Sequence, residues 1–250
     1  MKNSIKKKVE TFNTIIRLII NEIRKTGIYK LLLVDIIFLI VIIIIYKTNK
    51  DKLIDTSYSL IPFIGIFIII FFGGTISSEI DTGSIKSYLT KPVLRWKIYI
   101  SKLITIYIYI LLIVLYIIFI YLILINKIDY AFIIKYLKYS IPLLLIGTFS
   151  LFISTIIKNT ALCIGIDLFV LVFSSLLSQV LFGIEFTIIE YSFLPYLDFS
   201  IFNDKASLLA MNKELGIHLS IENGIIIDLL FTFTFYYFGN IIFINKDIKN

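Results

Sequence analysis

Apolar residues gather along the chain in six long runs, and polar or charged segments separate one run from the next. A helix of about 20 mostly apolar residues is long enough to cross the roughly 30 Å hydrocarbon core of a bilayer. The pattern therefore predicts six membrane-spanning helices, at about residues 28–46, 58–76, 98–125, 139–157, 162–182 and 224–244. Because we find no internal repeat and no long linker, the predicted fold is a single all-α transmembrane domain over residues 1–250.

The first 27 residues follow a different pattern, in which apolar residues recur at spacings of three and four. They are Ile5, Val9, Phe12, Ile16, Ile19 and Ile23, and the other face is charged or polar. This spacing is typical of an amphipathic helix that lies in the cytoplasmic headgroup layer. Two interpretations stay open for it: a membrane anchor that sets the topology, or a mechanical elbow that leads into the first span.

Composition supports a bilayer environment, because 59% of the 250 residues are hydrophobic and only 16% are charged. With the N-terminus inside, the predicted inner segments carry 16 Lys and Arg and the outer segments carry 8. The positive-inside rule then predicts a cell-membrane protein with both termini in the cytoplasm. The net charge of +7 lies beside the spans, which indicates contact with anionic lipid and argues against a nucleic-acid partner. One cysteine and one histidine argue against a metal site.

The segment between the second and third predicted spans carries helix signals of its own. Ser84, directly after Gly83, suits an N-cap, and Pro92 is expected to end the short helix that begins there. The apolar residues that would share one face of this helix are Ile85, Tyr88 and Leu89. Such a face suits docking of a soluble partner, although the residues alone slightly favour an ordinary interfacial turn.

The same segment contains an ordered set of motif residues that leads into the third span. They are Glu79, Gly83, Pro92, Arg95 and Lys97, followed by Ser101 and Lys102. This order resembles the first cytoplasmic loop of ABC-2 type permeases, which are the membrane subunits of ABC exporters. Leu94 departs from the small hydroxyl residue that often precedes the arginine in that family. The layout of elbow, spans and basic tail resembles the small permeases that export bacitracin-like or lantibiotic peptides.

The resemblance implies that the loop is a coupling helix, seated in a cleft of a separate ATP-binding subunit. The residues that it would assign to this coupling are Glu79, Gly83, Ile85, Tyr88, Leu89, Pro92, Arg95 and Lys97. Arg95 and Lys97 would anchor the loop at lipid headgroups, and Glu79 would brace it electrostatically. The partners implied are two ATP-binding subunits, which hold ATP and Mg²⁺, and a second permease chain, identical or related.

This chain itself contains no Gly-x-x-x-x-Gly-Lys-Ser/Thr segment, so we expect no ATPase activity and no cofactor in it. The rival interpretation is an ATP-independent secondary transporter or channel. That class is expected to show paired broken helices in two repeated halves, which the sequence does not indicate. An intramembrane enzyme is a third class, but scattered carboxylates and one histidine do not suit it.

Three carboxylates fall within the predicted spans: Asp35, Asp167 and Asp228. Acidic residues at membrane depth are costly to bury, which makes these three candidates for an intramembrane path. For Asp35 and Asp228 the favoured interpretation is that they line no path. Both lie near helix ends, where water can solvate them or a lysine such as Lys30 can pair with them. For Asp167 the two interpretations are evenly balanced.

The long outer segment, residues 183–223, is apolar for a loop. It predicts short helices that dip into the outer leaflet and cap a path through the protein. Packing alone explains its apolar residues equally well.

Overall fold

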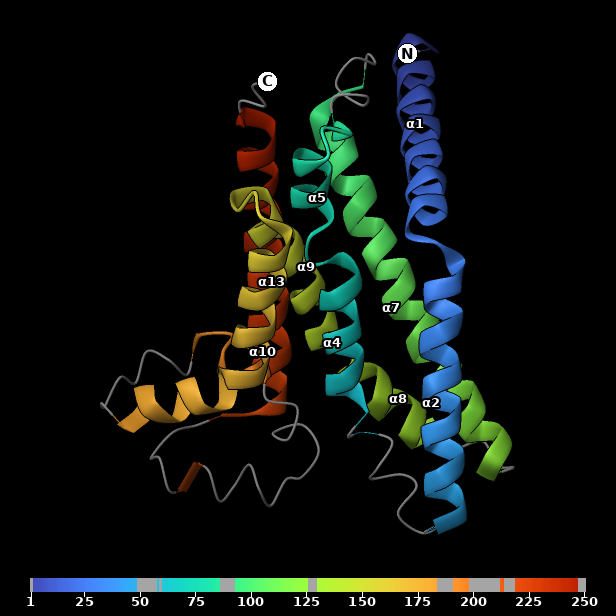
Figure 1. Ribbon diagram of the computed structural model, residues 1–250, viewed down its shortest axis with the longest axis vertical. Helices are drawn as coiled ribbons and strands as arrows, with labels where there is room; N and C mark the ends of the chain where they lie inside the picture. The colour runs from blue at the N-terminus through green and yellow to red at the C-terminus, as the bar shows by residue number, and fades with distance from the viewer. Residues whose placement is uncertain are drawn as a thin grey trace.

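The computed structural model describes residues 2–48, 58, 60–85, 93–125, 130–183, 191–197, 212–213 and 219–246. In these ranges the chain is helical apart from turns and contains no strand, which confirms the predicted all-α class. The helices, shown in Figure 1, are α1 Lys2–Thr26, α2 Ile28–Thr48, α4 Ile61–Phe72, α5 Thr75–Asp81, α7 Arg95–Ile125, α8 Tyr130–Tyr139, α9 Ile141–Ile156, α10 Thr160–Gly183 and α13 Ile221–Asn245. A short 3-10 helix, η3, covers Pro195–Leu197.

Several of these helices are long and apolar enough to cross a membrane, as expected for a multi-pass membrane protein. Within the described residues they occupy Tyr29–Lys47, Ile61–Asp81, Arg95–Ile125, Phe132–Ile156 and Ile221–Asn245. The predicted fifth span coincides with α10, a helix of 24 residues that begins with the apolar stretch Thr160–Ser174. Large apolar side chains such as Phe119 and Phe233 are more than half exposed, which suits contact with lipid.

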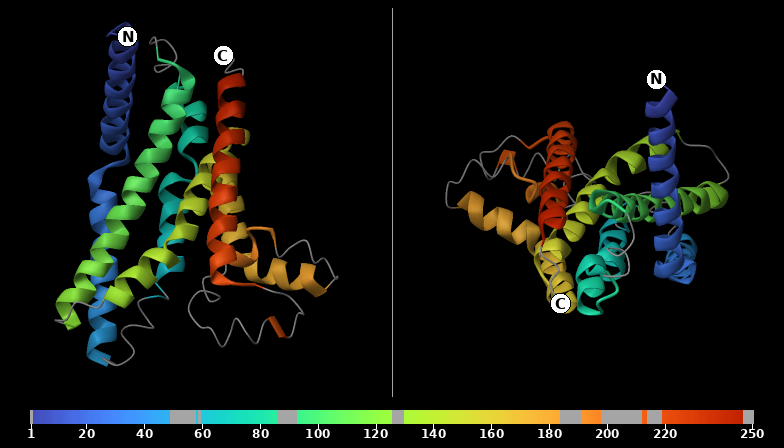
Figure 2. Two further views of the ribbon diagram at one scale, coloured as in Figure 1. Left: turned by 180° about the vertical axis from the view of Figure 1, so that it is seen from behind. Right: turned by 90° about the horizontal axis from the view of Figure 1, so that it is seen from above.

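The predicted amphipathic helix corresponds to α1, and its predicted apolar stripe is exposed only in part. Phe12 and Ile16 are exposed, whereas Leu18 and Glu22 are buried. Helix α1 packs on α7, and Ile23, the last member of the predicted stripe, packs against the core. Figure 2 shows α1 elongated both from the side and from above, whereas α2 is elongated only from the side, so the two helices meet at a bend.

Gly27 forms the bend between α1 and α2. Its φ of +83° belongs to the left-handed region, which favours glycine. A Cβ atom at this position would lie 2.3 Å from the Cε1 atom of the Tyr29 ring. A side chain there would therefore be strained both by its backbone and by its neighbour.

The second predicted span, residues 58–76, overlaps the apolar stretch Ile61–Asp81, which a turn at Gly73 and Gly74 divides into α4 and α5. Helix α4 ends at Phe72 and α5 begins at Thr75. The Thr75 hydroxyl donates to the Phe72 carbonyl at 2.5 Å and so pairs a backbone group at the break. A Cβ atom on Gly74 would lie 2.3 Å from Cγ2 of Thr160, because the start of α10 packs against this turn.

Helix α9 lies at the centre of the bundle and contacts α4, α7, α10 and α13. It begins next to Pro142, where a missing N–H costs little, and α8 precedes it at an angle (Figure 2). Its buried hydroxyl residues are Thr148, Ser150, Ser154 and Thr155. Small residues permit close approach, since a Cβ atom on Gly147 would lie 2.7 Å from Cγ2 of Ile106 on α7.

Most of the segment predicted to lie outside the cell, residues 183–223, is not among the described residues. Where it is described, the residues of η3 are buried, and the Tyr196 ring approaches the start of α13 at Gly224. The apolar character of this part is therefore used in packing against the bundle.

Candidate functional site

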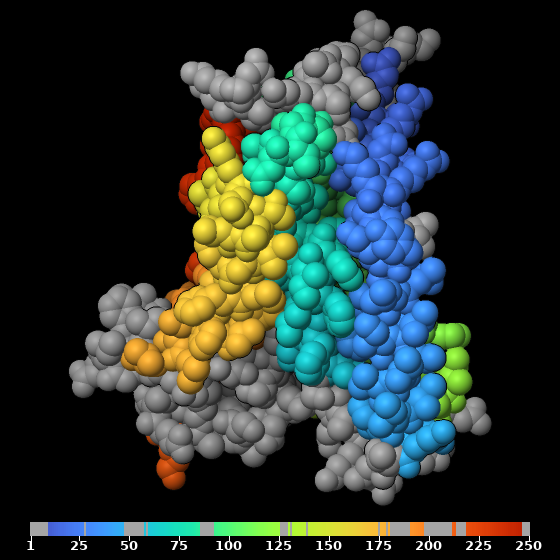
Figure 3. Space-filling model, viewed as in Figure 1, coloured from blue at the N-terminus to red at the C-terminus, as the bar shows by residue number. Residues whose placement is uncertain are grey.

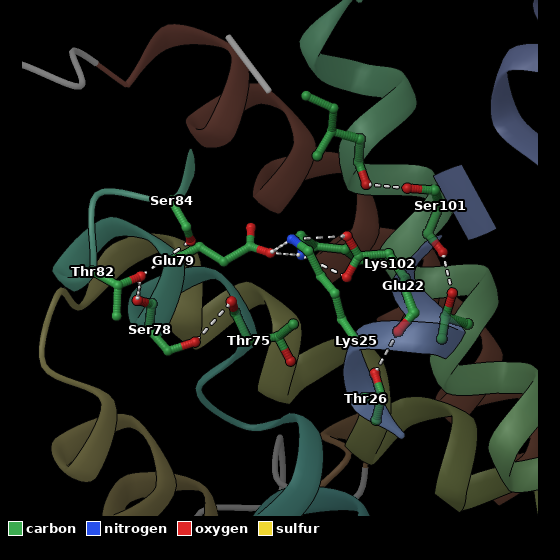
Figure 4. Close-up of polar contacts among 12 residues, drawn as sticks. Glu22, Lys25, Thr26, Thr75, Ser78, Glu79, Thr82, Ser84, Ser101 and Lys102 are labelled. Carbon is green, nitrogen blue, oxygen red and sulfur yellow. Dashed lines mark hydrogen bonds and ion pairs between the residues drawn. The ribbon is translucent and has the colours of Figure 1, made fainter. Parts of the chain in front are cut away.

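Four charged side chains from three helices meet at the end of the bundle that carries both termini (Figures 1 and 4). Helix α1 contributes Glu22 and Lys25, α5 contributes Glu79, and α7 contributes Lys102. The Lys102 ammonium lies 3.0 Å from Oε2 of Glu22 and 2.9 Å from Oε1 of Glu79. The Lys25 ammonium lies 3.1 Å from the same Oε1 atom of Glu79. We call these four residues the charge cluster.

The charge cluster balances two carboxylates against two ammonium groups, largely away from solvent. Lys102 is 1% exposed, Glu22 4% and Glu79 8%, whereas the Lys25 side chain is 45% exposed. Buried charges persist in proteins when they are paired, and removing one partner of such a pair costs about 3–5 kcal/mol. The cluster therefore holds α1, α5 and α7 together, and the loss of any one of its buried charges leaves the opposite charge uncompensated.

Hydroxyl side chains next to the charge cluster form hydrogen bonds within α1 and α7. Ser101, next to Lys102, donates to the carbonyl of Ile98 at 2.8 Å, and Thr105 donates to the carbonyl of Ser101 at 2.8 Å. On α1 the Thr26 hydroxyl donates to the Glu22 carbonyl at 2.9 Å, so the last turn is bonded just before the bend. Each of these hydroxyl groups donates to a backbone carbonyl of its own helix. The charged groups pair with one another between helices.

Glu79 is thus the one predicted coupling residue that lies in the charge cluster. Gly83, with φ +68°, follows the end of α5, and its N–H bonds to the Ile80 carbonyl at 3.1 Å. Gly83 therefore terminates α5 in the manner of a left-handed C-cap. Ile85 is fully buried. Tyr88, Leu89 and Pro92 lie outside the described residues, as does most of the predicted coupling helix.

Arg95 contacts the last helix of the protein, where we expected a lipid headgroup. Its Nη1 atom donates at 2.8 Å to the carbonyls of Ile244 and of Lys246. These carbonyls lie at the C-terminal end of α13, where backbone acceptors lack helical partners. The neighbouring Lys97 ammonium lies 5.9 Å from the centroid of the Trp96 ring.

Lys246 extends this connection to the central helix. Its ammonium donates to the Thr155 carbonyl near the end of α9. Burial lowers the pKa of this ammonium, and Lys158 lowers it further. Arg95 and Lys246 together join the ends of α7, α13 and α9 on the side of the bundle that carries the termini.

The three intramembrane carboxylates do not form one site. Asp167 accepts a hydrogen bond from the Ser150 hydroxyl, and a Cβ on Gly73 would lie 3.0 Å from its Oδ2 atom. Asp35 belongs to α2 and Asp228 to α13, and these two helices lie on opposite sides of the bundle in Figures 1 and 2. Both carboxylates are buried. Lys30 lies over the Phe71 ring, 5.4 Å from its centroid.

Sequence reasoning singled out Glu79 and Lys102 as parts of a motif, but not Glu22 and Lys25 as their partners. The amphipathic pattern placed the charges of α1 on a solvated face. The signal for a buried Glu22 is its spacing of four residues from Leu18, which places both side chains on the same buried face of α1.

Comparison with known families adds one finding. Residues 46–249 match the model of the family described as protein of unknown function, DUF2705. The chain belongs to the DUF2705 family. No curated protein matches the chain significantly. The DUF2705 match includes Glu79, Lys102 and Arg95, whereas Glu22 and Lys25 precede it. Helix α1 therefore supplies its half of the charge cluster from outside the matched region.

Proposed function

We propose that this chain is the membrane subunit of an ATP-driven ABC exporter of the ABC-2 type. The observation that carries the proposal is the pair formed by Glu79 on α5 and Lys102 on α7, 2.9 Å apart. These helices flank the loop whose sequence resembles the coupling segment of that family. A force applied to the loop by an ATP-binding subunit would reach α7 through this pair.

The surrounding geometry supports a mechanical role. Helix α5 has 7 residues and is separated from α4 by the turn at Gly73 and Gly74, so it is a short element with its own orientation. Helix α7 has 31 residues and is about 46 Å long at 1.5 Å per residue. Movement of α5 would therefore act near one end of a long helix, which extends through the bundle to its far end (Figure 1).

The proposed orientation places the charge cluster and both termini in or near the cytoplasm. It is supported by the excess of Lys and Arg in the predicted inner segments, 16 against 8. The termini lie at the same end of the bundle as α5 (Figure 1). ATP and Mg²⁺ would bind to the partner subunit, on that side.

The proposed complex contains a second permease chain, a copy of this one or a relative. Helix α13 presents exposed aromatic residues, with Phe233 66%, Tyr237 52% and Phe238 53% exposed. Such a face suits either lipid or a second chain at membrane depth. The proposed cargo is a peptide antibiotic of bacitracin or lantibiotic type, or another amphiphile, moved outward.

A second candidate, an ATP-independent transporter or channel, is favoured by a different observation. The second span breaks at Gly73 and Gly74, directly beside the buried Asp167. Interrupted helices next to buried charges are typical of ion-coupled transporters, which also use them in pairs from two repeated halves. Nucleotide dependence separates this class from the exporter.

The test uses the chain purified together with the ATP-binding subunit that it retains. Glu79→Gln keeps the size of the side chain and removes its charge, so it should uncouple the subunits. ATP hydrolysis should then lose most of the stimulation that bacitracin gives in proteoliposomes. Glu222→Gln, an exposed carboxylate in the first turn of α13, is the matched control and should behave as wild type. Equal stimulation in both variants would refute the coupling role of Glu79.

A further inference from the structure

A cavity of about 370 Å³ opens beside the charge cluster, between the bend of α1 and α2 and the helices α5 and α10. Figure 3 shows the corresponding seam, with α1 and α2 in blue on one side and α5 and α10 in teal and yellow on the other. This volume is large enough for a polar headgroup of several heavy atoms. Its lining contains cationic, hydroxyl and apolar side chains in separate parts.

The cationic part of the cavity is centred on Lys30. Glu22 and Glu79 are paired with Lys25 and Lys102, as described for the charge cluster. Lys30 lines the same cavity, and no ion pair to it occurs among the described residues. The charged side chains that line the cavity are Glu22, Glu79, Lys25 and Lys30, and both carboxylates are already paired within the charge cluster, so the Lys30 ammonium remains for an anion. The cavity therefore favours an anion.

The hydroxyl part of the cavity favours a ligand that donates hydrogen bonds. Its hydroxyl side chains include those of Thr75, Ser78 and Thr82. Each donates its own proton to a backbone carbonyl, at 2.5 Å, 3.2 Å and 2.8 Å respectively. The oxygen lone pairs of Thr75 and Ser78 stay available as acceptors, whereas the Thr82 oxygen also lies 3.1 Å from the Ser84 hydroxyl. A ligand with free hydroxyl groups beside its anionic group would satisfy both parts.

The apolar part of the cavity faces the membrane. Ile70, Phe71 and Ile164 line it, and Ile70 is 46% exposed. Lys30 stands in the first turns of α2, which then continues with the exposed apolar residues Leu32, Leu33 and Ile36. The cavity thus lies where the polar end of the bundle meets the lipid-facing surface, which is the depth of phospholipid headgroups.

We propose that this cavity binds the headgroup of an anionic phospholipid of the phosphatidylglycerol class. The phosphate lies against the Lys30 ammonium, and the glycerol hydroxyls donate to the hydroxyl oxygens on α5. The acyl chains leave past Ile70 and Ile164 into the leaflet next to the termini. The bound lipid bridges α2 and α5, beside the charge cluster. This site does not depend on the proposed export function.

The test measures lipid retention by the detergent-purified chain, using native mass spectrometry with added phosphatidylglycerol or phosphatidylcholine. We expect phosphatidylglycerol to bind more tightly than phosphatidylcholine. Lys30→Gln should weaken that binding about fivefold, the effect of one lysine near an anionic headgroup. Lys30→Arg should retain it. Lys47→Gln, with the same charge change in the exposed last turn of α2, should leave it unchanged.

Three outcomes would overturn the proposal. Equal affinity for phosphatidylglycerol and phosphatidylcholine would exclude an anionic site. Equal losses in Lys30→Gln and Lys47→Gln would show attraction by net charge alone. Soluble glycerol phosphate that displaces the lipid completely at equal concentration would show a phosphate site filled from solution instead of from the bilayer. Thermal unfolding of each purified variant checks that it is folded before lipid is added.

Discussion

Lys102 of α7 and Glu79 of α5 form a buried ion pair, with 2.9 Å between Nζ and Oε1. Glu79 precedes the loop between α5 and α7, and Lys102 follows it, so the ion pair links the two sides of the loop. Lys102 also bonds to Glu22, 80 residues away, so one ammonium group joins the end of α1 to both helices that flank the loop. Elements far apart in the sequence are thereby held in one unit.

Neutralising Lys102 should destabilise the protein strongly, because Glu22 and Glu79 would then be buried without their shared partner. For Lys102→Met we expect a loss of about 3–5 kcal/mol in the free energy of unfolding. Chemical unfolding in detergent, followed by circular dichroism, measures it. Lys158→Met changes an exposed lysine and should stay within about 0.5 kcal/mol of wild type.

The double variant Lys102→Met/Glu79→Gln tests whether the loss comes from uncompensated charge. Removing both partners should recover part of the stability lost by Lys102→Met alone, since one carboxylate no longer needs a counter-charge. If the double variant instead loses the sum of the stabilities lost by Lys102→Met and by Glu79→Gln, the two side chains act independently.

Gly74→Ala should disturb the turn between α4 and α5. The added Cβ atom would lie 2.3 Å from Cγ2 of Thr160, so either the Thr160 side chain or the two helices must shift. We expect a lower midpoint of thermal unfolding. Gly165→Ala is the control on α10, because nothing lies within 4 Å of a Cβ atom there. That variant should be neutral or slightly more stable, since alanine favours helix over glycine. A Gly74→Ala midpoint equal to wild type would contradict the tight packing of this turn.

Arg95→Ala should loosen the end of α13. The arginine donates two hydrogen bonds to its terminal carbonyls, and a charged bond of this kind contributes about 1.5–3 kcal/mol. Hydrogen exchange of the backbone amides in the last turn of α13 should become faster, whereas exchange at the start of that helix should not change. Unchanged protection in the last turn would mean that Arg95 does not stabilise this end.

The membrane helices were predictable because long apolar runs have few alternatives to a helix in a bilayer. The break at Gly73 and Gly74 was not, because glycine is tolerated within membrane helices. Here the break coincides with the close approach of Thr160, which only the packed structure reveals.

The charge cluster was predictable only in part. The motif identified Glu79 and Lys102, since both stand at recognisable positions of the loop and of the third span. Glu22 was assigned to a solvated face because the periodicity of α1 describes one helix in isolation. Its burial depends on which face α7 covers, and that face carries both the buried Leu18 and the ion pair of Glu22 with Lys102. Arg95 likewise finds its partners 149 and 151 residues away, beyond any local pattern.

The most direct test of the proposed function is to purify the chain gently from its native membrane, identify the proteins that remain bound, and measure bacitracin movement in proteoliposomes with and without ATP. The account predicts a bound ATP-binding subunit and movement that requires ATP and Mg²⁺. Movement of the peptide that continues without nucleotide, in a preparation that contains no ATPase, would contradict it.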